Sequence, residues 1–218
     1  MHWMTWLVSL GLIGTTTTTI SFDSAALGRM PAGWSPASAV HGAAPEWHVV
    51  KDPTAPSPPY VMAPVSADAA GRRTPLAVLD QSDLRDGEIS VRFKAVAGKE
   101  DRTAGLVWRY RDPNHYYVVC ANSLHNNVEV FLVRDGKRIP LLPKGRRGAQ
   151  YGVEHPVPSN VWGTLKVVFR GPVFSVYLNH RRIILTEDRN YGGPGKVGLW
   201  TENDSVTYFD DFQVLKRS

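Results

Sequence analysis

The sequence lacks the residues and motifs that define several large classes of protein. It holds one cysteine, Cys120, among 218 residues, so no disulfide can form within the chain. No His-x-x-x-His or Cys-x-x-Cys pair is present, and we therefore do not expect a catalytic zinc site. Gly-x-Ser-x-Gly and Gly-x-x-x-x-Gly-Lys are also missing, which argues against a serine hydrolase and against a nucleotide-binding loop.

Long apolar runs are scarce as well. The run from Trp6 to Ile13 has the length of a signal-peptide core and is too short to span a bilayer. We expect residues 1–19 to form an export leader that is cut upstream of Ile20, so that the protein is secreted, periplasmic or on the cell surface. A cut at Ser24–Ala26 would remove Phe22, which we expect in the first strand. The alternative is a disordered or wrongly assigned start.

No segment shows a convincing amphipathic helical period, whereas short alternating segments recur along the chain. The composition, 43% hydrophobic and 21% charged, suits one globular domain with a sizeable core, which we place at residues 20–218. The 19 glycines and 16 prolines are spread between the alternating segments as turn signals. Short strands separated by such turns predict an all-β sandwich or barrel.

The clearest pattern runs from Ala104 to Leu142 and reads as four consecutive strands. Residues 111–115 have turn chemistry, and Asp135-Gly136 is typical of a two-residue hairpin turn. The pattern therefore predicts a four-stranded antiparallel meander.

The register of this meander decides which side chains are buried. A five-residue loop at 111–115 would pair Trp108 with Val118 and bring Cys120 into the same core face, as a buried and unreactive thiol. Arg109 and Tyr117 would then lie on the opposite, outer face.

Six strand and turn segments form a familiar pattern: 105–110, 112–117, 126–131, 176–179, 197–200 and 205–212. Together they resemble the concanavalin A-like lectin/glucanase superfamily, and within it the bacterial 3-keto-disaccharide hydrolase-type and laminin-G-like exported domains. The resemblance covers about Ile20 to Arg217 and implies a jelly-roll sandwich of two curved antiparallel sheets. It also implies carbohydrate on the concave face or at the rim loops.

Catalysis is left open by the sequence. Retaining glycosidases of this superfamily carry Glu-x-Asp-x-x-Glu on one strand, which brings an acid and a nucleophile about 5 Å apart. Glu202-Asn203-Asp204 begins this pattern, but Thr207 stands at its sixth position. We expect Glu202 and Asp204, like the acids at 83–88, to be solvated loop residues. Arg102–Gly105 replaces the acidic and asparagine residues that hydrolase-type relatives place near this strand.

A structural calcium ion is the one cofactor that the resemblance implies. In several families of the superfamily an Asp on the last strand binds Ca²⁺ together with oxygens from the loop after the first strand. Here Asp210 would be that residue, with Asp23 and the carbonyl of Gly28 as partners. Asp210 shares its strand phase with Phe212, and an inward carboxylate is costly unless it is compensated. The alternative is that Asp210 accepts backbone hydrogen bonds at the strand margin.

The outer face of the meander supplies the expected binding residues. Aromatic rings and planar polar groups are the side chains that hold sugars, and their presence here favours a shallow sugar groove. The alternative for each is ordinary cross-strand packing, or core in the case of the tryptophan. The candidates are Arg92, Arg109, Tyr117, Glu129 and Trp200.

The basic residues are spread over separate connections. The formal charge is +5 and the pI about 9.4, which is mildly basic. Lys137-Arg138, Lys144–Arg147 and Arg181-Arg182 flank different turns, so we expect solvated turns and no nucleic-acid partner. If they converged, an anionic polysaccharide would be the natural ligand. Residues 143–158 are expected to form a flap or loop near the groove.

These observations predict an exported, monomeric β-sandwich that binds carbohydrate. The first alternative is an active hydrolase or lyase on oxidised or acidic sugars. The second is a laminin-G-like structural or protein-interaction module. Two carboxylates that converge on the concave face would favour an enzyme, and a grooved face with aromatic side chains would favour a sugar binder.

Overall fold

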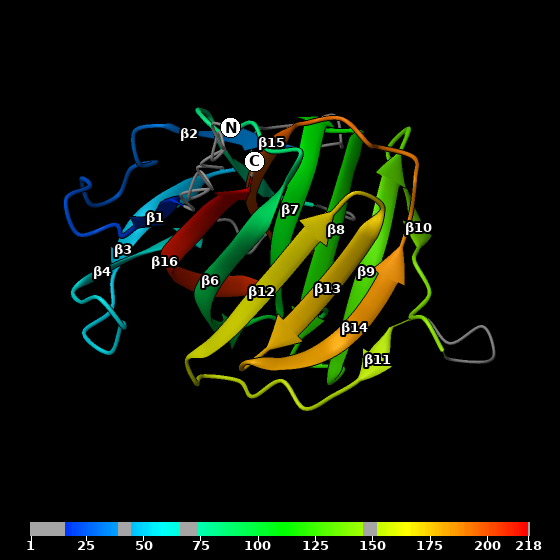
Figure 1. Cartoon of the computed structure of the whole chain (residues 1–218). Coiled ribbons are helices and arrows are strands. Elements are labelled where there is room, and N and C mark those ends of the chain that lie inside the picture. The colour runs from blue at the N-terminus through cyan, green and yellow to red at the C-terminus, as the bar shows by residue number, and fades with distance from the viewer. Residues whose placement is uncertain (1–15, 39–44, 66–73, 146–151, 218) are drawn as a thin grey trace, which may run out of the picture.

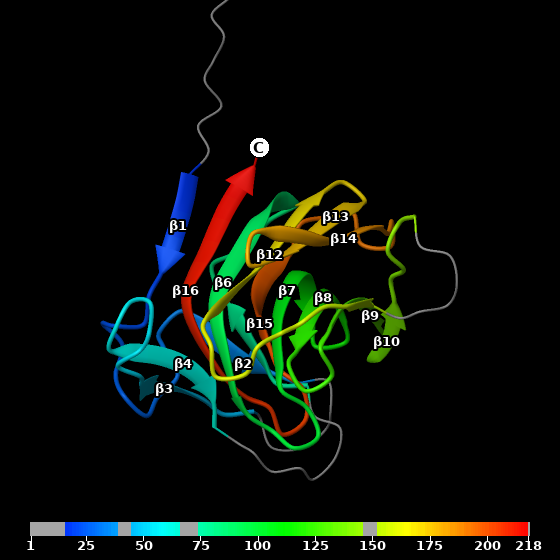
Figure 2. The same ribbon diagram turned by 90° about the horizontal axis from the view of Figure 1, so that it is seen from below.

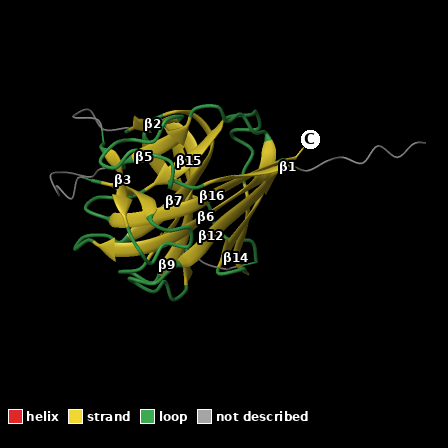
Figure 3. Ribbon diagram, turned by 90° about the vertical axis from the view of Figure 1, so that its left-hand side faces the viewer, coloured by secondary structure: helices red, strands yellow, loops and turns green. Residues whose placement is uncertain are grey.

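The protein is a sandwich of two antiparallel β-sheets (Figure 1). The computed structural model describes residues 16–38, 45–65, 74–145 and 152–217. These residues form strands and loops and no helix, as Figure 3 shows. Accordingly, no helix in this part of the chain is long and apolar enough to cross a membrane. The predicted all-β jelly-roll class is therefore confirmed.

Each sheet has eight strands. Sheet A has the order β14-β13-β12-β6-β16-β4-β3, and β1 also pairs with β16. Its strands are β1 (Thr16–Ile20), β3 (Trp47–Lys51), β4 (Tyr60–Pro64), β6 (Asp86–Ala97), β12 (Gly163–Arg170), β13 (Val173–Leu178), β14 (Arg181–Glu187) and β16 (Val206–Arg217).

Sheet B has the order β10-β9-β8-β7-β15-β5-β2, with β11 paired to β9. Its strands are β2 (Trp34–Ala37), β5 (Leu76–Leu79), β7 (Thr103–Asp112), β8 (His115–Asn122), β9 (Asn127–Arg134), β10 (Lys137–Pro140), β11 (Val153–Glu154) and β15 (Lys196–Trp200). The predicted meander is thus present as β7-β8-β9-β10. Asp135 and Gly136 both have positive φ, 51° and 71°, as the predicted tight hairpin turn requires.

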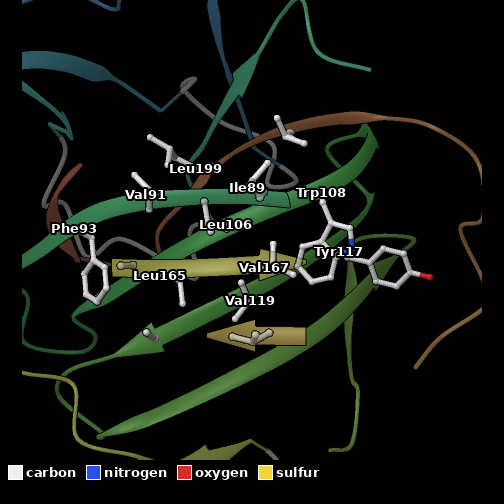
Figure 4. Close-up of a cluster of buried hydrophobic side chains, with 14 of the residues drawn as sticks. Ile89, Val91, Phe93, Leu106, Trp108, Tyr117, Val119, Leu165, Val167 and Leu199 are labelled. Atoms are coloured by element: carbon white, nitrogen blue, oxygen red, sulfur yellow. The ribbon is translucent and has the colours of Figure 1, made fainter. Parts of the chain in front are cut away.

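The main core lies between the sheets and follows the two-residue period of the strands. On β6, Ile89, Val91 and Phe93 point inward, and each is at most 2% exposed (Figure 4). Leu165 and Val167 of β12 meet them from the neighbouring strand. Each such side chain contributes about 1.5–3 kcal/mol when fully buried. In both strands the inward side chains thus follow the alternation of the sequence without interruption.

The register of β7 against β8 differs from the expected one. Trp108 pairs with Tyr117 rather than with Val118, because a bulge follows Trp108 and the turn is shorter than five residues. Arg109 lies in this bulge with φ at 49°. A shift of one residue exchanges the two faces of a strand, so Trp108 and Tyr117 stack in the main core with ring centres 5.5 Å apart.

The same shift gives the outer face of sheet B an apolar layer of its own. An antiparallel sheet commonly leaves this face to solvent, but here its side chains form a second buried cluster. Cys120 belongs to this layer, and its burial, as expected, raises the pKa of the thiol well above its usual value. The cluster consists of Leu76, Val78, Val107, Tyr116, Val118, Cys120, Phe131, Val133 and Trp200.

A second bulge interrupts β16. Asp210 pairs with Arg92 and Gln213 pairs with Ser90, so two residues of β16 stand opposite one residue of β6. Phe212 is consequently in the main core while Asp210 is not, and the expected common phase of these two residues is wrong. Asp210 is buried instead beneath the loop that contains Ser57.

The N-terminal strand lies at the edge of sheet A beside β16 (Figure 2). β1 ends at Ile20, whereas we expected the first strand to begin there and to contain Phe22. Phe22 lies in the following turn, where it is 1% exposed. Its ring packs against that of Trp34, with ring centres 6.1 Å apart. The expected domain boundary at Ile20 falls within this strand, and residues 1–15 of the expected leader lie outside the described residues.

Candidate functional site: a groove on the outer face of sheet B

A groove of about 680 Å³ lies over the outer face of sheet B. Strands β8, β9 and β10 supply most of its wall, and the loops before β5 and β7 and after β15 complete it. It is lined by Thr74, Asp101, Tyr116, Asn122, His125, Glu129, Phe131, Val133, Gly136, Lys137, Arg138 and Glu202.

Strand alternation explains how a polar group comes to lie on an apolar floor. On β9, Val128, Val130 and Leu132 enter the main core, so Glu129 and Phe131 must point outward. Phe131 joins the apolar cluster of the outer face, whereas the Glu129 carboxylate rises from it into the groove.

An ion pair crosses the groove from one side to the other. Arg138 of edge strand β10 contacts Glu202, which follows β15, at 2.5 Å. The Arg138 guanidinium also lies 5.3 Å from the ring centre of Phe131 and 6.0 Å from that of Trp200. Three strands separate β10 from β15, which in a flat sheet would place them about 19 Å apart. Two side chains meet over that span because the sheet curves, and the groove therefore occupies its concave face.

The charges of the groove are not balanced. Burial raises the pKa of Glu129 and of Glu202, and Arg138 partly opposes this shift in both. Asp101 raises the pKa of both residues further. Because Arg138 is paired with Glu202, the Glu129 carboxylate has no cation within ion-pair distance among the described residues. The groove thus presents a carboxylate, that of Glu129, which is free of an ion pair and can accept a hydrogen bond from a ligand.

One end of the groove is held rigid by a network around Asp101. Its carboxylate accepts hydrogen bonds from the Asn122 and Asn203 side-chain amides, each at 2.6 Å. Asp204 accepts the backbone N–H groups of Lys99, Glu100 and Asp101 at 2.6–3.1 Å, and these bonds hold its pKa below the usual value. The expectation that the acids at 202–204 are solvated loop residues is therefore wrong.

Arg109 and Tyr117 do not lie on the outer face where the predicted register placed them. Arg109 is 1% exposed, and its guanidinium donates to the carbonyls of Tyr191 at 2.8 Å and Gly171 at 2.6 Å. The Tyr117 hydroxyl donates to Asp188 and accepts the Tyr191 N–H. Both side chains fix interior loops, so neither has surface to offer a ligand.

The other three predicted binding residues are separated. Glu129 lines the groove, and Trp200 is fully buried in its floor, which agrees with the alternative of a core role. Arg92 lies on the outer face of sheet A, in a smaller hollow. Glu129 and Arg92 therefore face opposite sides of the sandwich and cannot contact one ligand together.

Two of the three residues proposed as calcium ligands, Asp210 and Asp23, lie near enough for their charges to interact. Asp210 is fully buried, and its oxygens accept the N–H groups of Ser57 and Asp211, each at 2.8 Å. Burial raises the pKa of Asp210 to about 6, against these hydrogen bonds, and the charges of Asp211 and Asp23 raise it further. Asp23 also accepts the Tyr60 N–H at 3.3 Å. A cation would relieve this repulsion, so the donor chemistry fits calcium.

The third proposed calcium ligand is the carbonyl of Gly28. This residue has φ at 71°, and its N–H donates to the Val49 carbonyl. Within the described ranges, no three His, Cys, Asp or Glu side chains are arranged to hold a metal. A calcium ion at Asp210 would therefore need backbone carbonyls among its ligands.

Sequence reasoning missed the two residues that cross the groove. Arg138 was assigned to a solvated turn and Glu202 to a solvated loop. Their partnership joins positions 64 residues apart, which depends on the curvature of the sheet. The sequence offered one indication. In the strand after the Asp135-Gly136 turn, Arg138 pairs with Val133 and its side chain therefore lies on the outer face of sheet B.

The described parts of the 143–158 segment run along strand edges. Lys144 donates its N–H to Leu185 of β14, and β11 pairs with the start of β9. Residues 146–151 lie outside the described residues, so the expectation of a flap or a mobile loop at 143–158 stays a prediction.

Comparisons with known proteins find likeness in structure and none in sequence. No protein-family model matches the chain. No curated protein sequence matches it either. The carbohydrate-binding module CBM66 from Bacillus subtilis superposes with a TM-score of 0.61 at 17% identity, over 85% of this chain and 96% of that one.

Two further structures are similar over most of their length. Domain 4 of AbnA, a GH43 extracellular arabinanase from Geobacillus stearothermophilus solved with arabinotriose, gives a TM-score of 0.56 at 12% identity over 91% of both chains. A Bacillus subtilis protein of unknown function with a galectin-like fold gives 0.52 at 10% identity, over 85% of this chain and 90% of that one. These likenesses show a jelly-roll β-sandwich fold.

Proposed function

We propose that the protein binds carbohydrate in the groove on the concave face of sheet B. The observation that carries this proposal is the set of half-buried acceptors and donors above an apolar floor. Sugar hydroxyls can donate to Glu129 and Glu202 and accept from Arg138, while the C–H face of a ring rests on Phe131. The similarity to a carbohydrate-binding module and to the arabinanase domain supports the same reading.

The charge of the groove favours neutral sugars over acidic ones. Three carboxylates, those of Asp101, Glu129 and Glu202, line it beside the two cations Lys137 and Arg138, and His125 lies against Asp101. Arg138 is already engaged by Glu202, so the carboxylates outnumber the cations that could meet a uronate, which disfavours its binding. The anionic polysaccharide was named only for the case that the basic turns converge.

The test is a glycan array with the wild type and Glu129→Gln, an isosteric change that removes the charge but keeps the shape. Charge-assisted hydrogen bonds contribute about 1.5–3 kcal/mol, so we expect binding to fall tenfold or more. Glu154→Gln is the matched control, because Glu154 is exposed on β11 outside the groove. Equal binding by wild type and Glu129→Gln would contradict this site. No glycan bound by either protein would favour the interaction-module alternative.

Glycoside hydrolysis is a second candidate function, because two glutamates with raised pKa enter one groove. Glu129, without a paired cation, would protonate the leaving oxygen, and Glu202, whose carboxylate is paired with Arg138, would take a proton from the attacking water. Mass analysis of any bound glycan after incubation separates the two functions. Intact ligand indicates a binder, and cleavage that Glu129→Gln abolishes indicates an enzyme.

We further propose that the protein is exported as a monomer and that Asp210 takes part in a structural calcium site with Asp23 and the Gly28 carbonyl. The apolar run at 6–13 and the extracellular source of the arabinanase domain support export. The buried, mutually repelling carboxylates support the calcium site.

A further inference from the structure

A second hollow, of about 250 Å³, lies on the outer face of sheet A. Its walls come from four strands that are adjacent in the sheet: β13, β12, β6 and β16. The outward-facing side chains of Arg92, Tyr177, His180, Asp211 and Gln213 surround it. None of these residues lines the groove on sheet B.

Arg92 has an incomplete set of hydrogen bonds in this hollow. One terminal nitrogen of its guanidinium donates to the Thr164 hydroxyl at 3.0 Å. Its Nε is buried and has no hydrogen-bond partner within the described chain. Buried donors are nearly always satisfied in native proteins, and because Arg92 lines the hollow, a water molecule or a ligand oxygen there would supply the missing acceptor.

Asp211 supplies a second and independent indication. It occupies the bulge of β16 with φ at 45°, a conformation that non-glycine residues seldom adopt. One carboxylate oxygen accepts the Ser57 hydroxyl at 2.7 Å, which leaves the other toward the hollow. A bulge re-aims the side chain that it carries, and Asp211 accordingly lines the hollow.

We propose that this hollow binds a single sugar ring through two neighbouring hydroxyl groups. Arg92 donates to these hydroxyls and Asp211 accepts from them, while His180 and Gln213 lie at the rim. Stacking plays no part, because Lys166 covers the Tyr177 ring at 4.7 Å from its centre and is itself paired with Glu88 at 3.2 Å. The small volume favours one ring at a chain end or branch over the middle of a polysaccharide.

The experiment is a titration of the ¹⁵N-labelled full chain, followed by NMR, with arabinotriose and the methyl glycosides of glucose, galactose and mannose as probes. In the wild type we expect at least one probe to shift the Arg92 Nε–H signal and the Asp211 and Gln213 amides in a saturable manner. Arg92→Lys keeps the charge but removes the planar donor fork, and it should weaken this binding at least tenfold.

A second variant and two controls make the outcome decisive. Asp211→Asn removes the carboxylate charge but tolerates the same positive φ, so it should fold and should also lose binding. Arg170→Ala, an exposed arginine at the end of β12, should bind as the wild type does. Glu129→Gln should leave these shifts unchanged, because the inference does not rest on the groove. Absence of shifts with every probe, or shifts that persist in Arg92→Lys and Asp211→Asn, would overturn the proposal.

Discussion

Two arginines of sheet B show how position, rather than residue type, decides a role. Arg109 is carried into the interior by a bulge, where its donors satisfy three backbone carbonyls, those of Arg85, Gly171 and Tyr191. Arg138 lies on the edge strand and keeps its guanidinium over the aromatic floor of the groove. A variant Arg109→Ala would therefore report on folding, whereas a change at Arg138 would report on the groove.

Asp210 gives a residue-scale prediction about pH. Its pKa in the folded protein is about 6, above the usual 3.8, so the folded state binds this proton more tightly than the unfolded state does. The stabilising effect of protonation is complete below pH 3.8 and is lost as the pH rises through about 6. Without bound cation, the free energy of unfolding of the wild type should therefore fall by on the order of 2 kcal/mol between pH 4.5 and 7.5. Asp210→Asn should lose this pH dependence, and because its single amide oxygen can accept only one of the Ser57 and Asp211 N–H groups, it should not be more stable than the protonated wild type. Urea denaturation of both proteins at pH 4.5 and 7.5 checks this.

The same pH comparison tests the calcium proposal. A bound calcium ion would compensate the buried carboxylate, so the fall in wild-type stability between pH 4.5 and 7.5 would then be absent in the presence of calcium and would appear after EDTA treatment. EDTA would also lower the melting temperature of the wild type, as scanning calorimetry would show. A melting temperature that EDTA leaves unchanged argues against the ion.

At the scale of strands, two shortened chains would separate the contribution of β1 to stability from that of Phe22. A chain that starts at Ile20 loses the exposed threonines of β1, whereas one that starts at Asp23 also loses Phe22, which is 1% exposed against Trp34. Removing a buried phenylalanine side chain costs about 3–5 kcal/mol, so the shorter chain should be far less stable. Thermal unfolding of the two chains, beside the full-length protein, measures the difference. Equal melting temperatures would show that Phe22 does not anchor this edge.

The strands also show what the sequence could and could not predict. On β6 and β12 the alternation is unbroken, and the inward residues follow directly from the period of two. On β7 and β16 a bulge inserts one residue, and beyond the bulge every side chain predicted to point inward points outward, and the reverse. Arg109 and Tyr117 were misplaced for this reason, and Asp210 was assigned the phase of Phe212. A bulge at a non-glycine residue leaves no compositional mark that a reading of alternation can detect.

The groove itself was beyond prediction for a different reason. Glu129 was found because its outward phase depends only on local alternation along β9. Arg138 and Glu202 meet because sheet B is curved, which is a property of the whole sheet. The fold could therefore be predicted from repeated local patterns, but the partners in the groove could not.

At the scale of the whole molecule, each sheet turns one face to the common core and the other away from it. The groove occupies the outer face of sheet B and the smaller hollow that of sheet A, so the two openings point in opposite directions. If both take sugar, one folded chain joins two separate glycans without forming a dimer. Such a protein would cross-link a polysaccharide network, and the thickness of the sandwich would set the spacing between the polysaccharide chains that it joins.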